Sequence, residues 1–156
     1  MSIAACRNTL DTLGKFFNRS LEAFDESDSG FAPFPGMFSV AQQVAHSAQT
    51  IDWFLVGAFD PKGMKEDWED QELKVRAVTS LAKAKAWHDE AIQRVQEKLS
   101  NTSEADWMAP IAEKSIMGGA PRASIFETIL DHAAHHRGSL AVYARCAGKT
   151  PVMPYM

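Results

Sequence analysis

The sequence predicts an all-α fold, a four-helix bundle in which a long crossover connection joins the second and third helices. Four segments repeat apolar residues at helical spacing, and no segment between them alternates apolar and polar residues convincingly as a strand would. The length of 156 residues is enough for one core. We therefore expect a single helical domain that spans residues 1–156.

The first predicted helix covers residues 2–24. Its apolar residues recur at spacings of three and four, as on one face of an amphipathic helix, at Leu10, Leu13, Phe17, Leu21 and Phe24. Residues 25–38 then gather Ser, Asp, Gly and two prolines around three phenylalanines, Phe31, Phe34 and Phe38. This composition indicates an ordered loop that is anchored by its aromatic rings.

The second predicted helix begins after Ser39, because Ser39 and Gln42 have the spacing of a capping box. Its apolar stripe consists of Val40, Val44, Ala48, Ile51 and Leu55, and we expect it to end between residues 57 and 61. At about 100° per residue, His46 lies on a different face from this stripe. Periodicity alone therefore predicts that His46 is at the surface.

Residues 62–78 are charged and interrupted, and we expect a long connection with a helical turn. The third helix is predicted from residue 79 or 80 to about 100, with His88 on its apolar stripe. Ser103 resembles the cap of a short helical turn. The fourth helix is expected to begin at Pro121 or Ser124 and to end before Gly148, a typical residue after a helix.

The composition excludes several classes of protein. Acidic and basic residues are mixed along the chain, with a net charge of −4 and no basic stripe, so we expect no nucleic-acid partner. No apolar run approaches the roughly 20 residues of a membrane span, and the first residues lack the pattern of a signal peptide. We expect a cytoplasmic protein. Cys6 and Cys146 stand alone, which disfavours a disulfide framework or a thiolate zinc site and predicts buried thiols.

Three of the five histidines lie within residues 131–138. On a helix His132 and His136 project within about 40° of each other, on the apolar stripe, whereas His135 and Asp131 flank that direction or point outward. A core histidine usually bonds to a carbonyl or water, but two buried imidazoles at this spacing are also satisfied by one metal ion. By spacing, His88 is a better third ligand than His46.

Several metal chemistries do not fit the residues around this pair. A zincin protease needs Glu directly after the first histidine, where Ala133 stands, and di-iron bundles need Glu three residues before each histidine, where Ile129 and Ala133 stand. The Cys-x-x-Cys-His motif of covalent haem is also missing. A histidine pair with one ligand from another helix would leave an open coordination position.

Three stretches together resemble the DinB/YfiT superfamily: residues 35–53 with His46, residues 132–138 with the motif H-A-A-H-H-R-G, and the ending at residues 148–155. The resemblance implies a helical bundle with a crossover and one divalent metal ion bound by His46, His132 and His136. It therefore reverses the periodicity result for His46 and favours it over His88. Members are often dimers, and some transfer or isomerise groups with low-molecular-weight thiols.

From these features we expect a metal-dependent thiol transferase or hydrolase-type enzyme with a small-molecule substrate, a homodimer in solution. Zn²⁺ or Ni²⁺ is the first choice of metal, and Fe²⁺ or Mn²⁺ is the alternative. A non-catalytic stress-response or binding module, with structural metal or buried histidines, is the competing hypothesis. Further candidates near the site are Gln42, Gln49 and Asp52 to orient a ligand, Trp53 and Tyr143 as pocket walls, and Arg137 to attract an acidic substrate.

Overall fold

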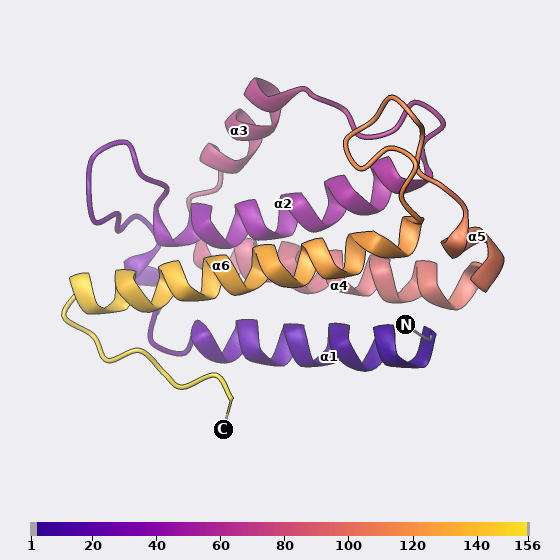
Figure 1. Cartoon of the computed structure of the whole chain (residues 1–156). Helices are drawn as coiled ribbons and strands as arrows, with labels where there is room; N and C mark the ends of the chain where they lie inside the picture. Colours follow the sequence, from indigo (N-terminus) through magenta and orange to yellow (C-terminus); the bar gives the residue numbers. More distant parts are fainter. Residues whose placement is uncertain (1–2, 156) are drawn as a thin grey trace.

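Four long helices make up most of the protein in a computed structural model, which describes residues 3–155 (Figure 1). They are α1 (Ile3–Ser20), α2 (Val40–Phe59), α4 (Leu81–Asn101) and α6 (Ile125–Cys146). Two shorter helices, α3 (Trp68–Arg76) and α5 (Glu104–Met108), and two 3-10 turns, Glu26–Asp28 and Arg122–Ser124, lie in the connections. Residues 3–155 contain no β-strand, and the all-α prediction is confirmed.

The order of the helices is set by one long connection. In Figure 1, α1 and α6 run in one direction, and α2 and α4 run in the other. Because α2 and α4 are parallel, residues 60–80 must return the chain to the end at which α2 began, and α3 lies on this return path outside α2. The crossover expected between the second and third long helices is therefore present, and its helical part is a nine-residue helix rather than a single turn.

The core forms where the apolar stripes of the long helices meet. α2 packs against α4, α6 and α3, whereas α1 packs against α4 and α6. The predicted stripes are buried, and α2 also buries residues on its other faces, among them Ala41, Gln43, Ala45 and Ser47. A helix with neighbours on three sides has little solvent-facing surface, so its stripe does not show which polar residues are exposed.

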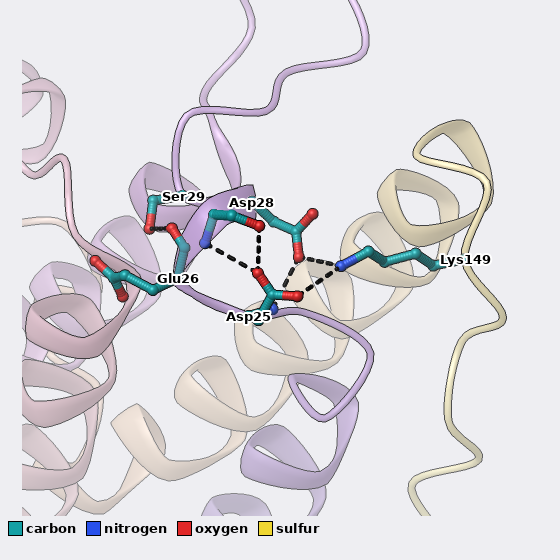
Figure 2. A network of polar contacts seen from close by, with 6 residues as sticks. Asp25, Glu26, Asp28, Ser29 and Lys149 are labelled. Carbon is teal, nitrogen blue, oxygen red and sulfur yellow. Dashed lines mark hydrogen bonds and ion pairs between the residues drawn. The ribbon is translucent and has the colours of Figure 1, made fainter.

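A polar network joins the loop after α1 to the ends of two other helices (Figure 2). The Lys149 ammonium, just beyond α6, pairs with Asp28 and lies 3.3 Å from an oxygen of Asp25. On the other side, the first two backbone N–H groups of α4 donate to the Ser29 hydroxyl and to the Glu26 carboxylate, each at 2.9 Å. Since the donor groups at a helix start lack partners within the helix, this loop fixes the beginning of α4.

Several sequence predictions need correction at the level of single residues. The first helix ends at Ser20, earlier than expected, and Leu21 and Phe24 are buried within the turns that follow. Ser2, expected in that helix, lies outside the described residues. Phe34 is 73% exposed and does not anchor its loop. Cys6 is buried as predicted, but Cys146 is exposed because it lies on the outer face of α6.

The predicted helix ends agree closely with the structure elsewhere. The Ser39–Gln42 capping box starts α2, Ser80 caps α4, and Ser103 caps α5. α6 begins after a 3-10 turn and is followed by Gly148, whose φ of +73° is the conformation that favours glycine. Among the described helices, none has both the length and the apolar content that crossing a membrane requires.

Candidate metal centre

The structure brings His46, from the first half of α2, next to His132 and His136 of α6. The His46 ring centroid lies 5.2 Å from each of the other two, which are 4.5 Å from one another. One ring nitrogen of each residue can be chosen so that all three nitrogens lie within 4.8 Å of one another. His136 is buried, and the other two are half-buried at the edge of a cleft.

A chain of hydrogen bonds holds the His136 ring in place. His136 Nδ1 lies 2.6 Å from the Gln43 side-chain oxygen, and Gln43 Nε2 donates to the Tyr143 hydroxyl at 3.0 Å. The Tyr143 hydroxyl in turn donates to the backbone carbonyl of Phe38 at 2.9 Å. Gln43 and Tyr143 are themselves buried, so water does not compete for these bonds.

This chain also decides which nitrogen of His136 carries the proton. The Tyr143 hydroxyl gives its only proton to a carbonyl, so its oxygen must accept from the amide nitrogen of Gln43. The amide oxygen of Gln43 therefore faces His136 and can only accept, which places the imidazole proton on Nδ1. His136 Nε2 is therefore unprotonated, and its lone pair faces His132, whose Nε2 is at hydrogen-bonding distance, 3.2 Å away.

Replacing Gln43 with Leu is expected to weaken Zn²⁺ binding by about 10- to 100-fold, because His136 loses the acceptor that fixes its ring and tautomer. Gln43→Glu keeps an acceptor oxygen and should retain most of the affinity. Competition with a chromophoric chelator measures the Zn²⁺ affinity of both Gln43 variants. The control is Gln93→Leu, the same change on the exposed face of α4. Wild-type affinity in Gln43→Leu would show that the bond to His136 plays no part.

The side chains next to His46 are tied to the crossover. Burial lowers the pKa of His46, and the Gln49 side chain, one turn along α2, opposes this shift. Gln49 Nε2 donates to the Gln71 side-chain oxygen, while Gln71 Nε2 donates to Asp67 and to the Lys65 carbonyl. Because Gln71 belongs to α3, this short helix holds the Gln49 side chain beside a candidate ligand on α2.

The cluster favours neutral imidazoles. Burial, followed by the neighbouring His46 and His135, lowers the pKa of His132 to about 4. Burial, followed by the neighbouring histidines, also holds the pKa of His136 well below its usual value. Burial lowers the pKa of His46 too, although Gln49 and Glu72 oppose that shift. At neutral pH the three rings are therefore uncharged and have lone pairs to share, as metal ligands must.

The distances agree with a tetrahedral zinc site. Two imidazole nitrogens bound to one zinc ion at about 2.0–2.1 Å lie about 3.3 Å apart. The 3.2 Å between the Nε2 atoms of His132 and His136 matches this value. With the third nitrogen within 4.8 Å, the His46 ring needs to approach by no more than about 1.5 Å. Binding also requires His132 to carry its proton on Nδ1 rather than Nε2.

A cleft of about 630 Å³ opens beside the three histidines, a volume typical of small-molecule sites. His46 and His132 line it together with residues of α2, α3 and α6: Phe38, Gln49, Thr50, Trp53, Phe54, Trp68, Gln71, Glu72, Thr128, Asp131 and His135. His135 and Asp131 are exposed, as their helical positions predict, yet both face the cleft.

His88, the alternative ligand, lies apart from the cluster. It is 1% exposed and stacks on Phe17 in the core, with ring centroids 3.9 Å apart. The apolar stripe of α4 predicts correctly that His88 is buried, but the His88 ring packs on Phe17 of α1 rather than facing the cleft. The histidine that joins His132 and His136 is His46.

Other predicted site residues are divided between the cleft and the rest of the protein. Gln49 and Trp53 line the cleft, whereas Tyr143 is a buried member of the Gln43 network rather than a pocket wall. Asp52 does not orient His46, because it pairs with Arg94 and accepts from the Trp87 indole. Gln42 caps α2 and donates to the Arg76 carbonyl.

Arg137 lies outside the histidine cleft. Its guanidinium stacks on Phe16 and Tyr155, with distances of 5.6 and 5.5 Å to the ring centroids. Cation–π contacts of this kind link α6 to α1 and to the C-terminal tail. Arg137 is therefore placed to stabilise the packing of the tail rather than to attract an acidic substrate to the histidines.

Sequence reasoning missed Gln43 and Gln71. Gln43 stands three residues before His46, so a polar residue within one turn of a candidate ligand is the signal that could have identified it. Gln71 had no comparable signal, because it reaches the site only through the path of the crossover.

A model of a known protein family, described as the DinB superfamily, matches residues 9–140. That range contains all three clustered histidines and the amide side chains of Gln43, Gln49 and Gln71. No curated protein sequence matches the chain.

Proposed function

The chain belongs to the DinB superfamily, and on that premise we propose that it binds one divalent transition metal ion through His46, His132 and His136. The observation that carries the proposal is the unprotonated Nε2 of buried His136, whose lone pair the Gln43 network directs toward His132. Imidazole ligands suit Zn²⁺, Ni²⁺ and Fe²⁺, whereas Mn²⁺, the other alternative, prefers carboxylate and water ligands.

We further propose that the site is catalytic. Structural zinc sites are closed by four protein ligands, whereas three ligands beside a cleft leave a position for water or substrate. A bound metal ion with three neutral ligands would lower the pKa of a thiol or water molecule that it coordinates. Around that position the cleft supplies the aromatic side chains of Phe38, Trp53, Phe54 and Trp68, and Gln49 lies beside His46.

This chemistry supports a thiol transferase or hydrolase-type enzyme that acts on a small molecule. The competing function is a binding or stress-response module in which the metal only stabilises the fold. Chelation separates the two, because an open site releases metal while the helices stay folded, and a structural site unfolds. The homodimer and the cytoplasmic location remain predictions from the sequence.

The thiol proposal predicts that low-molecular-weight thiols bind to the Co²⁺-substituted protein as thiolates. 2-Mercaptoethanol should produce a thiolate-to-cobalt absorption band, and the pH midpoint of this band should lie below the pKa of the free thiol. His132→Ala should abolish the band.

If no thiol changes the cobalt spectrum, the thiol substrate is rejected, but the proposal that the three histidines bind metal is retained. The transferase reaction itself is tested by mixing metal-loaded protein with thiols and small electrophiles. Turnover that is absent across the series, in protein shown to contain metal, would favour the non-catalytic function.

A further inference from the structure

The wall of the histidine cleft is largely aromatic. Trp53 and Trp68 face one another across the junction of α2 and α3, with ring centroids 5.3 Å apart and planes inclined at 51°. The Trp53 indole N–H is held by the Lys65 carbonyl at 2.7 Å, so that ring has a fixed orientation. Trp68 is 52% exposed although it is a large apolar side chain. An exposed, partly pre-oriented aromatic wall beside a cleft favours a flat apolar ligand.

The charges in the cleft are all of one sign. Glu72 of α3 and Asp131 of α6 are its only formally charged lining residues among those described, and both are acidic. Without metal, the cleft therefore presents a negative potential to a ligand.

The nearest cation is already engaged by its surroundings. The Arg76 guanidinium contacts one oxygen of Glu72 at 2.7 Å, donates to the Gly36 carbonyl at 3.2 Å and lies over the Phe38 ring at 4.8 Å. Arg76 thus covers the outer side of Phe38 and is not among the residues that line the cleft.

Asp131 has no such compensation. It is exposed, it lies next to His132, and its carboxylate makes no hydrogen bond or ion pair with any other residue of 3–155. Asp131 and Glu72 come from different helices that both border the cleft, so a ligand inside it can approach either carboxylate.

From this arrangement we propose that the cleft binds a molecule in which an ammonium group is attached to a flat apolar body. Asp131 and Glu72 receive the ammonium group, and the rings of Trp53 and Trp68 receive the body and contribute cation–π attraction. The inference deepens the proposed function by naming a class of substrate, and it rests on that function only in taking this cleft as the substrate site. It replaces the acidic substrate that the sequence suggested.

The test uses three probes that share a phenyl ring and differ in charge: phenethylamine, 2-phenylethanol and 3-phenylpropionate. Binding to the metal-free protein is measured at neutral pH by calorimetry and by the fluorescence of the cleft tryptophans. Phenethylamine should bind about tenfold more tightly than the alcohol, and the carboxylate should bind most weakly.

Two substitutions and a control identify the carboxylates. Asp131→Asn should remove most of the preference for the amine over the alcohol, and Glu72→Gln should reduce it, while the affinity for the alcohol stays the same. Glu97→Gln, which removes an exposed carboxylate from α4 outside the cleft, should leave the preference intact. Both cleft substitutions are at exposed positions, and circular dichroism checks that the variants are folded.

Equal binding of the three probes, tighter binding of the carboxylate, or an unchanged preference in both cleft variants would overturn the inference. Because the probes are tested without metal, these outcomes do not depend on the metal-binding proposal. If the protein prefers the amine but takes up no Zn²⁺, the proposed function is rejected and the amine specificity of the cleft is retained.

Discussion

His136→Ala is expected to lower the affinity for Zn²⁺ by about 100-fold or more. Zinc binding at structural sites of four ligands is worth on the order of 10–16 kcal/mol, which amounts to about 3 kcal/mol for each ligand. His136 is the ligand whose lone pair is pre-oriented, so the loss should be at least that large. Competition against a chromophoric chelator measures the affinity, and His46→Ala and His132→Ala should behave alike.

A neighbouring histidine provides the matched control. His135 is adjacent to His136, and their ring centroids are 5.1 Å apart, yet His135 is exposed and outside the three-nitrogen cluster. His135→Ala should bind Zn²⁺ within a few-fold of the wild type. If His135→Ala and His136→Ala lost affinity equally, the ligand set would be wrong.

His88→Leu is expected to stabilise the protein, and more strongly in acid. Neither ring nitrogen of His88 has a hydrogen-bond partner among the described residues, and leaving such groups unpaired in a core costs about 1–3 kcal/mol. Leucine is similar in size and carries no polar atom. Near neutral pH the free energy of unfolding should therefore rise by about 1 kcal/mol.

The pH dependence follows from the depressed pKa of His88. Burial lowers it to about 3, so below about pH 6.5 the unfolded chain takes up a proton that the folded protein does not. The folded state loses stability as the pH falls from about 6.5 toward 3, by about 2 kcal/mol at pH 5. His88→Leu removes this loss, so its advantage should grow by that amount.

Urea unfolding tests this expectation. The wild type and His88→Leu are compared in the presence of a chelator, at about pH 7.5 and about pH 5. The chelator removes metal from the comparison, and the clustered histidines are present in both proteins. Of the neighbours that lower the pKa of His136, His88 is the weakest. An advantage of His88→Leu that is the same at both pH values would mean that His88 is solvated or paired in the folded state.

Local patterns predicted the helices because capping and apolar spacing are properties of neighbouring residues. Ser39, Ser80 and Gly148 mark helix ends in the structure as they do in the sequence. The end of α1 was missed because Leu21 and Phe24 continue the apolar spacing, although the chain has already turned. Tertiary contacts bury Leu21 and Phe24 although these residues lie in turns rather than in a helix.

The histidines show where local patterns stop being informative. His132 and His136 lie on one helix, so their spacing alone predicted that they point the same way. His46 and His88 could be ranked only by apolar stripes, and the stripe of α2 is misleading because the helix has neighbours on three sides. Resemblance to the family supplied what spacing could not. Neither spacing nor the resemblance identifies Gln71, because its position next to the site depends on the path of the crossover.

Ring-nitrogen NMR of the histidines during a Zn²⁺ titration tests the metal site most directly. The metal-stripped, untagged protein should saturate at one Zn²⁺ per chain. One ring nitrogen each of His46, His132 and His136 should shift to values typical of metal ligands, and His136 should bind through Nε2 with Nδ1 still protonated. His88 should not change. A titration in which the three clustered histidines keep their metal-free shifts, or in which His88 moves instead of His46, would contradict the account.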